Sequence, residues 1–307
     1  MPHTRLTTDP IPVYHLDSGR PGPGLLIHAV RHGNELSGAE VARRFVLRAR
    51  RELQRGRVVV VPVASPLALH ARTYTYQPPE GPNQVSRWPG RPDGDDSERL
   101  IHRLREVIDE PSLDVCVDIH CGEPAFASWA IERIGYAPAR ELADLCAFRI
   151  IRPSEPIDWT PTGYFNSTGR AGVTLELSGT YEITEREVRR GLRACLNIAR
   201  HLGMMPGEIE LDPPSLRVAP DDLVPVKAGE SGLHMSSRPR PGDLVRAGQT
   251  VCRLLRERDW RATAIKAPVG GILHTLGPNR PGAHNNLQAR HAYVEPGEVL
   301  AHIAPLP

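Results

Sequence analysis

The sequence lacks the features that would place the protein in a membrane, in the secretory route or on nucleic acid. It has no run of about 18 or more apolar residues, so we expect no transmembrane helix. The polar segment 1–12 has no apolar stretch of the kind that marks a secretory signal peptide. Lys and Arg total 38 against 36 Asp and Glu, and the net charge of +2 gives no electrostatic reason to bind nucleic acid or an acidic membrane surface.

Cysteine is scarce and is not spaced for a structural role. The five cysteines are an odd number, and no Cys-x-x-Cys pair occurs. We therefore expect neither a disulfide framework nor a zinc site built from cysteines in a chain of 307 residues. A reduced, cytoplasmic setting fits this composition.

The first two thirds of the chain alternate short strand-like runs with helical patterns. Strands are predicted at 25–30, 58–63, 114–119 and 173–177, and helices at 37–55, 97–108, 137–148 and 184–202. Two of the helices should begin with capping boxes, Ser37 with Glu40 and Thr184 with Glu187. This order is typical of an α/β fold with helices on both faces of a sheet, and ligands bind at the strand ends of such sheets.

Two segments depart from this alternation. Segment 72–96 is rich in Pro and Gly and has little periodicity, and a loop of this length in a compact domain is usually functional or disordered. Segment 206–220 is rich in Pro and acidic residues, as in a linker, and from residue 222 onward short β-like runs are separated by Gly and Pro, with no long helical pattern. We predict one domain over 1–207, and a linker with a smaller, barrel-like all-β domain over 208–307.

Three residues at predicted strand ends suggest a metal site. His32 and Glu35 follow one strand at a spacing of three, and His120 follows the strand at 114–119. Two histidines and one carboxylate, with an open fourth position for water, are the usual donors of a hydrolytic zinc site. The alternative is structural: His32 and Glu35 would be polar residues at a helix beginning, stabilised by the helix dipole, and His120 a polar strand end.

Glu176 is a carboxylate within an otherwise apolar strand. Alternation should place Val173, Leu175 and Leu177 on one face and Glu176 on the other, towards a polar site. A buried carboxylate needs a partner or a purpose. It would be either a general base that takes a proton from water or a structural acid paired with an arginine.

Three segments of the sequence resemble a known family. His32-Gly-Asn-Glu35, Asp118-Ile-His120 and Thr174-Leu-Glu176-Leu-Ser-Gly179 are similar, in order and spacing, to the signature blocks of the succinylglutamate desuccinylase/aspartoacylase family. That family is a branch of the zinc carboxypeptidase-like amidohydrolases. The helix at 184–202 and the β-rich C-terminal region also resemble it.

The resemblance implies a fold and a set of roles. The fold would be a mixed sheet flanked by helices, as in zinc carboxypeptidases, followed by the smaller all-β domain. The cofactor would be one Zn²⁺ per chain, bound by His32, Glu35 and His120, with Glu176 as the general base. Arg72, in His70-Ala-Arg-Thr-Tyr74, matches the family arginine that polarises the scissile carbonyl.

One segment departs from the family pattern. Family members place an Asn-Arg pair, which often holds a substrate carboxylate, before Phe-Pro-Gly. Aligned on Pro89-Gly90, these positions hold Val85 and Ser86, and Arg87 is displaced by one residue. Asn83, Ser86 and Arg87 remain candidates for substrate binding. We expect diacid substrates such as N-acetylaspartate and succinylglutamate to be poor.

The sequence thus predicts a zinc-dependent amidohydrolase that cleaves the amide of a small N-acylated amine or amino acid. One alternative is a metallocarboxypeptidase acting on peptides, which shares the zinc chemistry but needs an extended groove. Another is a metal-binding member of the family that has lost activity. The small-molecule N-acyl substrate is the expected partner, and the chain could form a homo-oligomer.

Overall fold

The computed structural model describes residues 3–7, 11–76, 87–123, 125–155, 157, 159–212, 215–236, 238–278, 280 and 291–307. The chain divides into two compact units, one of 1–121 with 129–215 and one of 122–128 with 216–307. Segment 122–128 thus joins the second unit, which the sequence did not predict. The domain division at residue 207 stays a prediction.

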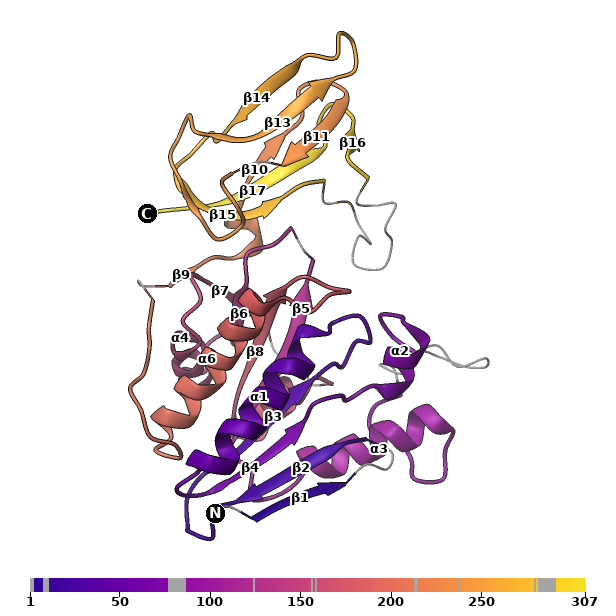
Figure 1. The fold of residues 1–307 in the computed structure, drawn as a ribbon, viewed down its shortest axis with the longest axis vertical. Helices are drawn as coiled ribbons and strands as arrows, with labels where there is room; N and C mark the ends of the chain where they lie inside the picture. The colour runs from indigo at the N-terminus through magenta and orange to yellow at the C-terminus, as the bar shows by residue number, and fades with distance from the viewer. Residues whose placement is uncertain are drawn as a thin grey trace. The chain divides into compact units, whose positions relative to one another are not determined.

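The larger unit is built around a mixed sheet (Figure 1). Its strands follow the order β1-β2-β4-β3-β5-β8-β6-β7. They are His3–Thr7 (β1), Val13–Asp17 (β2), Gly24–Ala29 (β3), Arg57–Val61 (β4), Val115–Gly122 (β5), Trp129–Arg133 (β6), Ile150–Ser154 (β7) and Ala171–Ser178 (β8). The two-residue strand Leu216–Arg217 (β9) comes directly after residue 215, where the larger unit ends. The central strands β4, β3 and β5 are parallel, whereas β8 and β6 are antiparallel.

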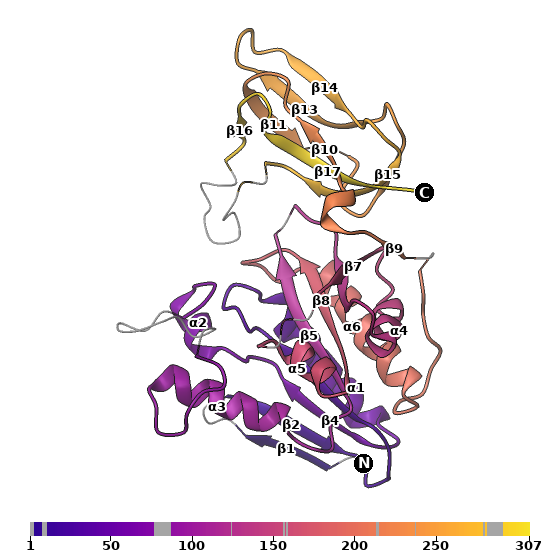
Figure 2. The same cartoon turned by 180° about the vertical axis from the view of Figure 1, so that it is seen from behind.

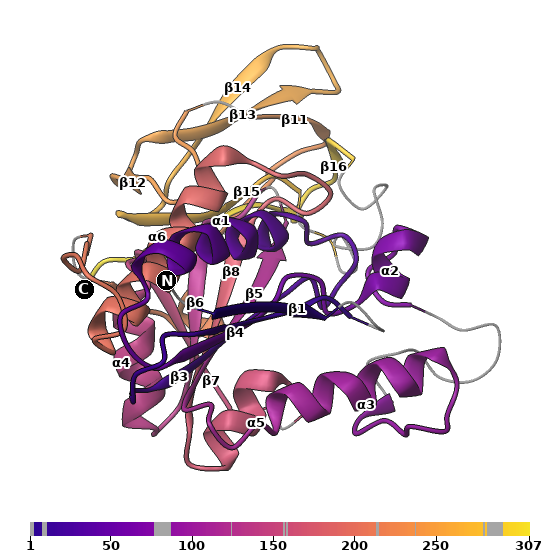
Figure 3. The same cartoon turned by 60° about the horizontal axis from the view of Figure 1, so that its bottom comes forward.

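Helices cover both faces of this sheet. They are Ser37–Glu52 (α1), Pro66–Ala71 (α2), Asp96–Ile108 (α3), Ala137–Leu145 (α4), Pro161–Ser167 (α5) and Glu185–His201 (α6). One buried core joins α1, α4 and α6 to one face, and a second core joins α3 and α5 to the other. Figures 2 and 3 show α3 and α5 on the side of the sheet opposite α1 and α6. The fold class predicted from the sequence is confirmed.

The second unit is antiparallel and all-β. Its strands form two four-stranded sheets of order β10-β17-β15-β12 and β14-β13-β11-β16. They are Val224–Lys227 (β10), Gly232–Ser236 (β11), Leu244–Val245 (β12), Thr250–Arg256 (β13), Ala262–Lys266 (β14), Gly271–Leu276 (β15), Tyr293–Val294 (β16) and Val299–Pro305 (β17). A one-turn 3₁₀ helix, Pro220–Asp222, precedes them. Inward-facing aliphatic residues of both sheets form a separate core.

Both predicted capping boxes are wrong. The α1 helix begins after Leu36, and the Ser37 hydroxyl donates to the Glu182 carbonyl at 3.3 Å. At α6 the Thr184 side chain makes no capping hydrogen bond, and a Glu187 carboxylate oxygen instead accepts from the Ser178 amide at 3.2 Å. The local sequence predicted caps, but the Ser37 side chain instead bonds to the connection between β8 and α6, and the Glu187 side chain bonds to the end of β8. Among the described residues, no helix has both the length and the apolar character needed to cross a membrane.

Candidate metal centre

The structure brings His32, Glu35 and His120 together. One ligand atom from each of the three buried side chains lies within 4.8 Å of the others. His32 Nδ1 is 2.8 Å from Glu35 Oε1, and His120 Nδ1 is 3.2 Å from His32 Nδ1. Residues separated by 88 positions in sequence thus converge, because parallel neighbours β3 and β5 end at the same edge of the sheet.

These donors fit a metal ion in spacing and chemistry. In a zinc tetrahedron with bonds of about 2.05 Å, ligand atoms lie about 3.3 Å apart, close to the separations found here. Glu35 Oε2 is buried and makes no acceptable hydrogen bond with the described residues, although His120 Nδ1 lies only 2.9 Å away. Burial works to raise the pKa of Glu35, but His120 and His32 lower it to about 2, so this carboxylate is ionised. An ionised, buried oxygen without a hydrogen-bond donor is suited to a cation.

Backbone geometry explains how the turn after β3 presents His32. Val30 has a φ of 50°, which is unusual for a β-branched residue and costs conformational energy. The Ser65 amide, which follows β4, donates to the Val30 carbonyl at 3.0 Å and holds this turn. Gly33 is required by close packing, since a Cβ there would lie 2.2 Å from the Ala68 carbonyl carbon of α2. The neighbouring strand and helix therefore impose the local shape.

Part of the predicted loop reaches the cluster. The Tyr74 ring stacks on the His32 ring, with centroids 3.8 Å apart and planes at 19°. The Tyr74 carbonyl accepts a hydrogen bond from the Gly33 amide at 3.0 Å. Burial, with Glu35 and Glu176 nearby, raises the pKa of Tyr74. Segment 72–76 thus helps to fix the orientation of one donor.

Asp118 orients the second histidine. Its carboxylate is fully buried, with Oδ2 at 3.0 Å from His120 Nε2 and Oδ1 at 2.6 Å from His28 Nδ1. A histidine ligand commonly donates its other ring N–H to a carboxylate, which fixes its tautomer and leaves the remaining nitrogen for the metal. The spacing of Asp118, His120 and the cross-strand partner His28 was the available sequence signal, since all three lie on one face of adjacent strands.

Glu176 lies on the same polar face of the sheet. Val173, Leu175 and Leu177 are buried in the core, and Glu176 alternates with them as predicted. It pairs in register with Trp129 of β6. Burial raises the pKa of Glu176 to about 8, and Glu35 and Asp118 act in the same direction.

The structural alternative for Glu176 needs an arginine partner. Glu176 forms no ion pair with any described residue, and Arg152 of β7 influences it only at longer range. The Arg152 guanidinium instead lies over the Trp129 ring, 5.6 Å from its centroid. Within the described part of the chain, Glu176 is therefore a half-buried carboxylate without an ion-pair partner, in electrostatic range of His120.

The other predicted site residues are placed less directly. Arg72 is exposed at the end of α2, where it adopts a φ of 58° two residues before Tyr74. Arg87 lies next to the beginning of α3, and its guanidinium is 2.8 Å from the Asp95 carboxylate. Asn83 and Ser86 lie outside the described residues. The sequence analysis gave no role to Arg31, which directly precedes His32 and is only 9% exposed.

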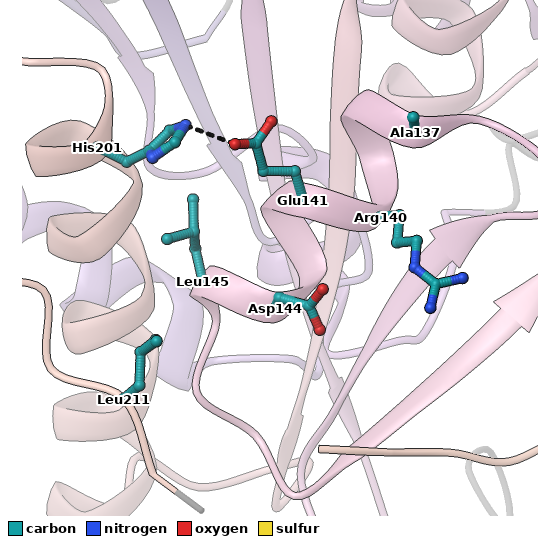
Figure 4. A pocket seen from close by; sticks show the side chains of 7 residues that line it. All are labelled: Ala137, Arg140, Glu141, Asp144, Leu145, His201 and Leu211. Carbon is teal, nitrogen blue, oxygen red and sulfur yellow. Dashed lines mark ion pairs between the residues drawn. The ribbon is translucent and has the colours of Figure 1, made fainter. Parts of the chain in front are cut away.

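Two hollows on the larger unit lie away from these residues. One, of about 430 Å³, lies between α4 and the end of α6 (Figure 4). There His201 Nε2 is 3.2 Å from the Glu141 carboxylate. The other, of about 510 Å³, is lined mainly by arginines of α6. None of the predicted site residues lines either hollow.

With this geometry, comparison with known proteins identifies the family. The profile of the succinylglutamate desuccinylase/aspartoacylase catalytic domain matches residues 21–202, which contain the whole cluster. The chain belongs to this family. The family resemblance predicted from the three signature blocks is therefore confirmed, and β3, β5 and β8, which carry the cluster, lie in the matched region.

Relatives in the family agree over most of the chain. An N-alpha-acetyl-L-2,4-diaminobutyric acid deacetylase of Halomonas elongata is 28% identical over 255 residues, covering 80% of this chain and 73% of the relative. A succinylglutamate desuccinylase from Silicibacter sp. has a TM-score of 0.69 at 22% identity, covering 98% of this chain and 92% of that one. Product-bound EutE (DoeB), an ectoine utilization protein of Ruegeria pomeroyi, has a TM-score of 0.66 at 21% identity, with 99% and 92% covered.

The solved structures share the fold of this chain. Because they are only 21–22% identical to it, the likeness to them shows the fold alone. The family match and the curated relative support an amidohydrolase of the deacylase type. The group of donors that could hold a metal ion fits this class.

Proposed function

We propose that this chain is a zinc-dependent deacylase that hydrolyses the amide of a small N-acylated amino acid. The observation that carries the proposal is the convergence of His32, Glu35 and His120 near Glu176, a carboxylate that has no ion-pair partner in the described part of the chain. His32, Glu35 and His120 would hold one Zn²⁺. When bound, such an ion supplies Lewis-acid activation of water and of the scissile carbonyl.

Glu176 would move the proton. Its pKa of about 8 is raised by burial, and a group titrating close to neutrality can both accept and return a proton. Glu176 would take a proton from the attacking water and deliver it to the leaving amine. The exposed guanidinium of Arg72 would stabilise the developing oxyanion. Its position two residues before Tyr74, which stacks on His32, supports this role.

The substrate class follows from the relative and from the departure at residues 83–90. The Halomonas elongata relative is named for N-α-acetyl-L-2,4-diaminobutyric acid, and we extend the class of N-acylated amino acids to this chain. A substrate role for Arg87 would require sharing or breaking its contact with Asp95, 2.8 Å away. Asn83 and Ser86 stay proposals on the sequence alone.

The test combines metal analysis with a substrate screen. Purified protein should contain one zinc per chain. It should release the acyl group from N-acetyl amino acids that carry a single carboxylate faster than from the diacids N-acetylaspartate and succinylglutamate. The same screen should include C-terminal peptide substrates. Hydrolysis of peptides alone would favour a metallocarboxypeptidase, and bound zinc without any hydrolysis would favour a member that has lost activity.

A further inference from the structure

Arg31 is a buried cation that directly precedes His32 and forms no ion pair with any residue that the structure describes. Its side chain is only 9% exposed, and its NH2 nitrogen donates to the Trp159 backbone carbonyl at 2.9 Å. The NH1 nitrogen is buried and has no hydrogen-bond partner in the part of the chain that the structure describes. Burying a charged donor without a hydrogen-bond partner costs free energy of folding, and a bound acceptor at the NH1 nitrogen would offset this cost.

The carboxylates around Arg31 are already committed. Asp118, Tyr74 and Glu35 all influence Arg31 electrostatically, so the guanidinium lies near the cluster. Asp118, however, bonds to His28 and His120, and Glu35 contacts both histidines of the cluster. Among the described residues, no carboxylate forms an ion pair with Arg31, so the anion of a bound substrate could complete its contacts.

The surroundings of Arg31 place it on the side where a substrate would lie. Trp159, which accepts its hydrogen bond, immediately precedes Thr160 and α5. That helix packs on the same sheet face as Glu176, where the Thr162 and Thr174 hydroxyls lie 3.0 Å apart. A cation at the end of β3 is thus available from one side of the cluster. By contrast, Arg87 is engaged with Asp95.

We propose that Arg31 binds the carboxylate of the amino-acid half of the substrate. This inference rests on the proposed function and deepens it, because it makes an N-acyl amino acid anion the preferred substrate over a neutral N-acyl amine. The two N–H groups of NH1 are donors to a carboxylate, and such charge-assisted bonds are strong and directional. A single carboxylate is recognised in this way, so the second acid of a diacid gains nothing from Arg31.

The test compares an acid with the same compound in which an uncharged carboxamide replaces the carboxylate. The substrates are N-α-acetyl-L-2,4-diaminobutyrate and its α-carboxamide, hydrolysed by wild type, Arg31→Gln and Arg31→Lys. Wild type should prefer the acid. Arg31→Gln should raise KM for the acid about 10- to 100-fold, as expected for losing a hydrogen bond to a charged group. The Arg31→Gln variant should leave kcat for the acid nearly unchanged, and likewise kcat and KM for the carboxamide, so that the preference for the acid disappears. The Arg31→Lys variant should restore part of this preference.

Arg170→Gln is the matched control. This half-buried arginine also donates to backbone carbonyls, those of Ile108 and Leu113 at 3.0 and 3.5 Å, but it lies at the other end of β8 from Glu176. It should lower stability without changing the preference for the acid. An equal loss on acid and amide in Arg31→Gln would overturn the proposal and leave the deacylase assignment standing.

A binding measurement separates the inference from the proposed function. Calorimetry with the Glu176→Gln protein measures the affinity for acid and amide without turnover, with and without Arg31→Gln. If no variant hydrolyses either compound but binding of the acid still depends on Arg31, the proposed function fails and the assignment of Arg31 holds. If neither binding nor hydrolysis distinguishes acid from amide, Arg31 is not the carboxylate site.

Discussion

Replacing Glu176 with Gln should slow the reaction and, in metal-free protein, stabilise the fold. Burial raises the pKa of this carboxyl from 4.5 to about 8. The folded protein therefore holds the proton more tightly than the unfolded chain, whose pKa is the ordinary one. Stability is unaffected below about pH 4.5, falls as pH rises towards 8, and levels off above it. Gln cannot ionise, so the Glu176→Gln protein escapes this loss.

The magnitude follows from the shift in pKa. Between 4.5 and pH 7 the shift of Glu176 corresponds to at most about 3 kcal/mol, at 1.36 kcal/mol per pH unit. The ceiling is about 5 kcal/mol at pH 9. Residual exposure of the side chain reduces both figures, because water stabilises the charged form. For a domain of about 200 residues, 3 kcal/mol corresponds to a rise in Tm of about 6–12 °C.

The assay is thermal unfolding of chelator-treated protein between pH 5 and pH 9, alongside steady-state kinetics of the zinc-loaded enzyme. Glu176→Gln should gain stability over wild type as pH rises and should lose at least about 10²-fold in kcat while retaining zinc. Glu132→Gln is the control, a second buried glutamate that alternates with Trp129 and faces away from Glu176. Parallel pH profiles of stability for wild type and Glu176→Gln, or a near-normal kcat, would refute the reasoning.

Three further predictions concern the donors and their neighbours. The double variant His32→Ala, His120→Ala should lose zinc altogether, and elemental analysis showing full zinc in it would contradict the assigned ligands. Asp118→Asn should weaken zinc affinity or activity about 10- to 100-fold, because the amide cannot accept from His28 and His120 together; chelator competition measures this, and unchanged affinity would argue against the orienting role. Arg72→Ala should lower kcat about 10²–10³-fold with a smaller change in KM, and a rise in KM alone would make Arg72 a binding residue.

Local sequence determined a large part of the polar sheet face that carries Glu176 and the cluster of His32, Glu35 and His120. Alternation along β8 is sufficient to separate Glu176 from the apolar residues of the core, because successive side chains point to opposite faces. Likewise, His32 and Glu35 are three residues apart, and their proximity follows from one turn of chain. The strands β3, β4, β5 and β8 were all predicted, since each is a run of mostly apolar residues.

Weakly patterned elements could not be found in this way. The strands β6 and β7, with the sequences WAIER and IIRPS, carry charged residues or proline, and the helices α2 and α5 are short. These segments take their structure from the neighbouring strands and the core against which they pack. The predicted capping boxes were wrong for the opposite reason. Their local pattern is strong, but the Ser37 and Glu187 side chains form tertiary hydrogen bonds instead of caps.

Only the tertiary structure decided which groups face one another. The sequence supplied His28, His32, Asp118 and His120, but the parallel pairing of β3 with β5 brought His120 to His32 and Asp118 to His28. The fold also buried Arg31 without an ion-pair partner among the described residues and turned Arg87 towards Asp95. The sequence by itself therefore determined the kinds of donor and their order along the chain. The fold determined their convergence and their electrostatic environment, because both depend on neighbours that are distant in sequence.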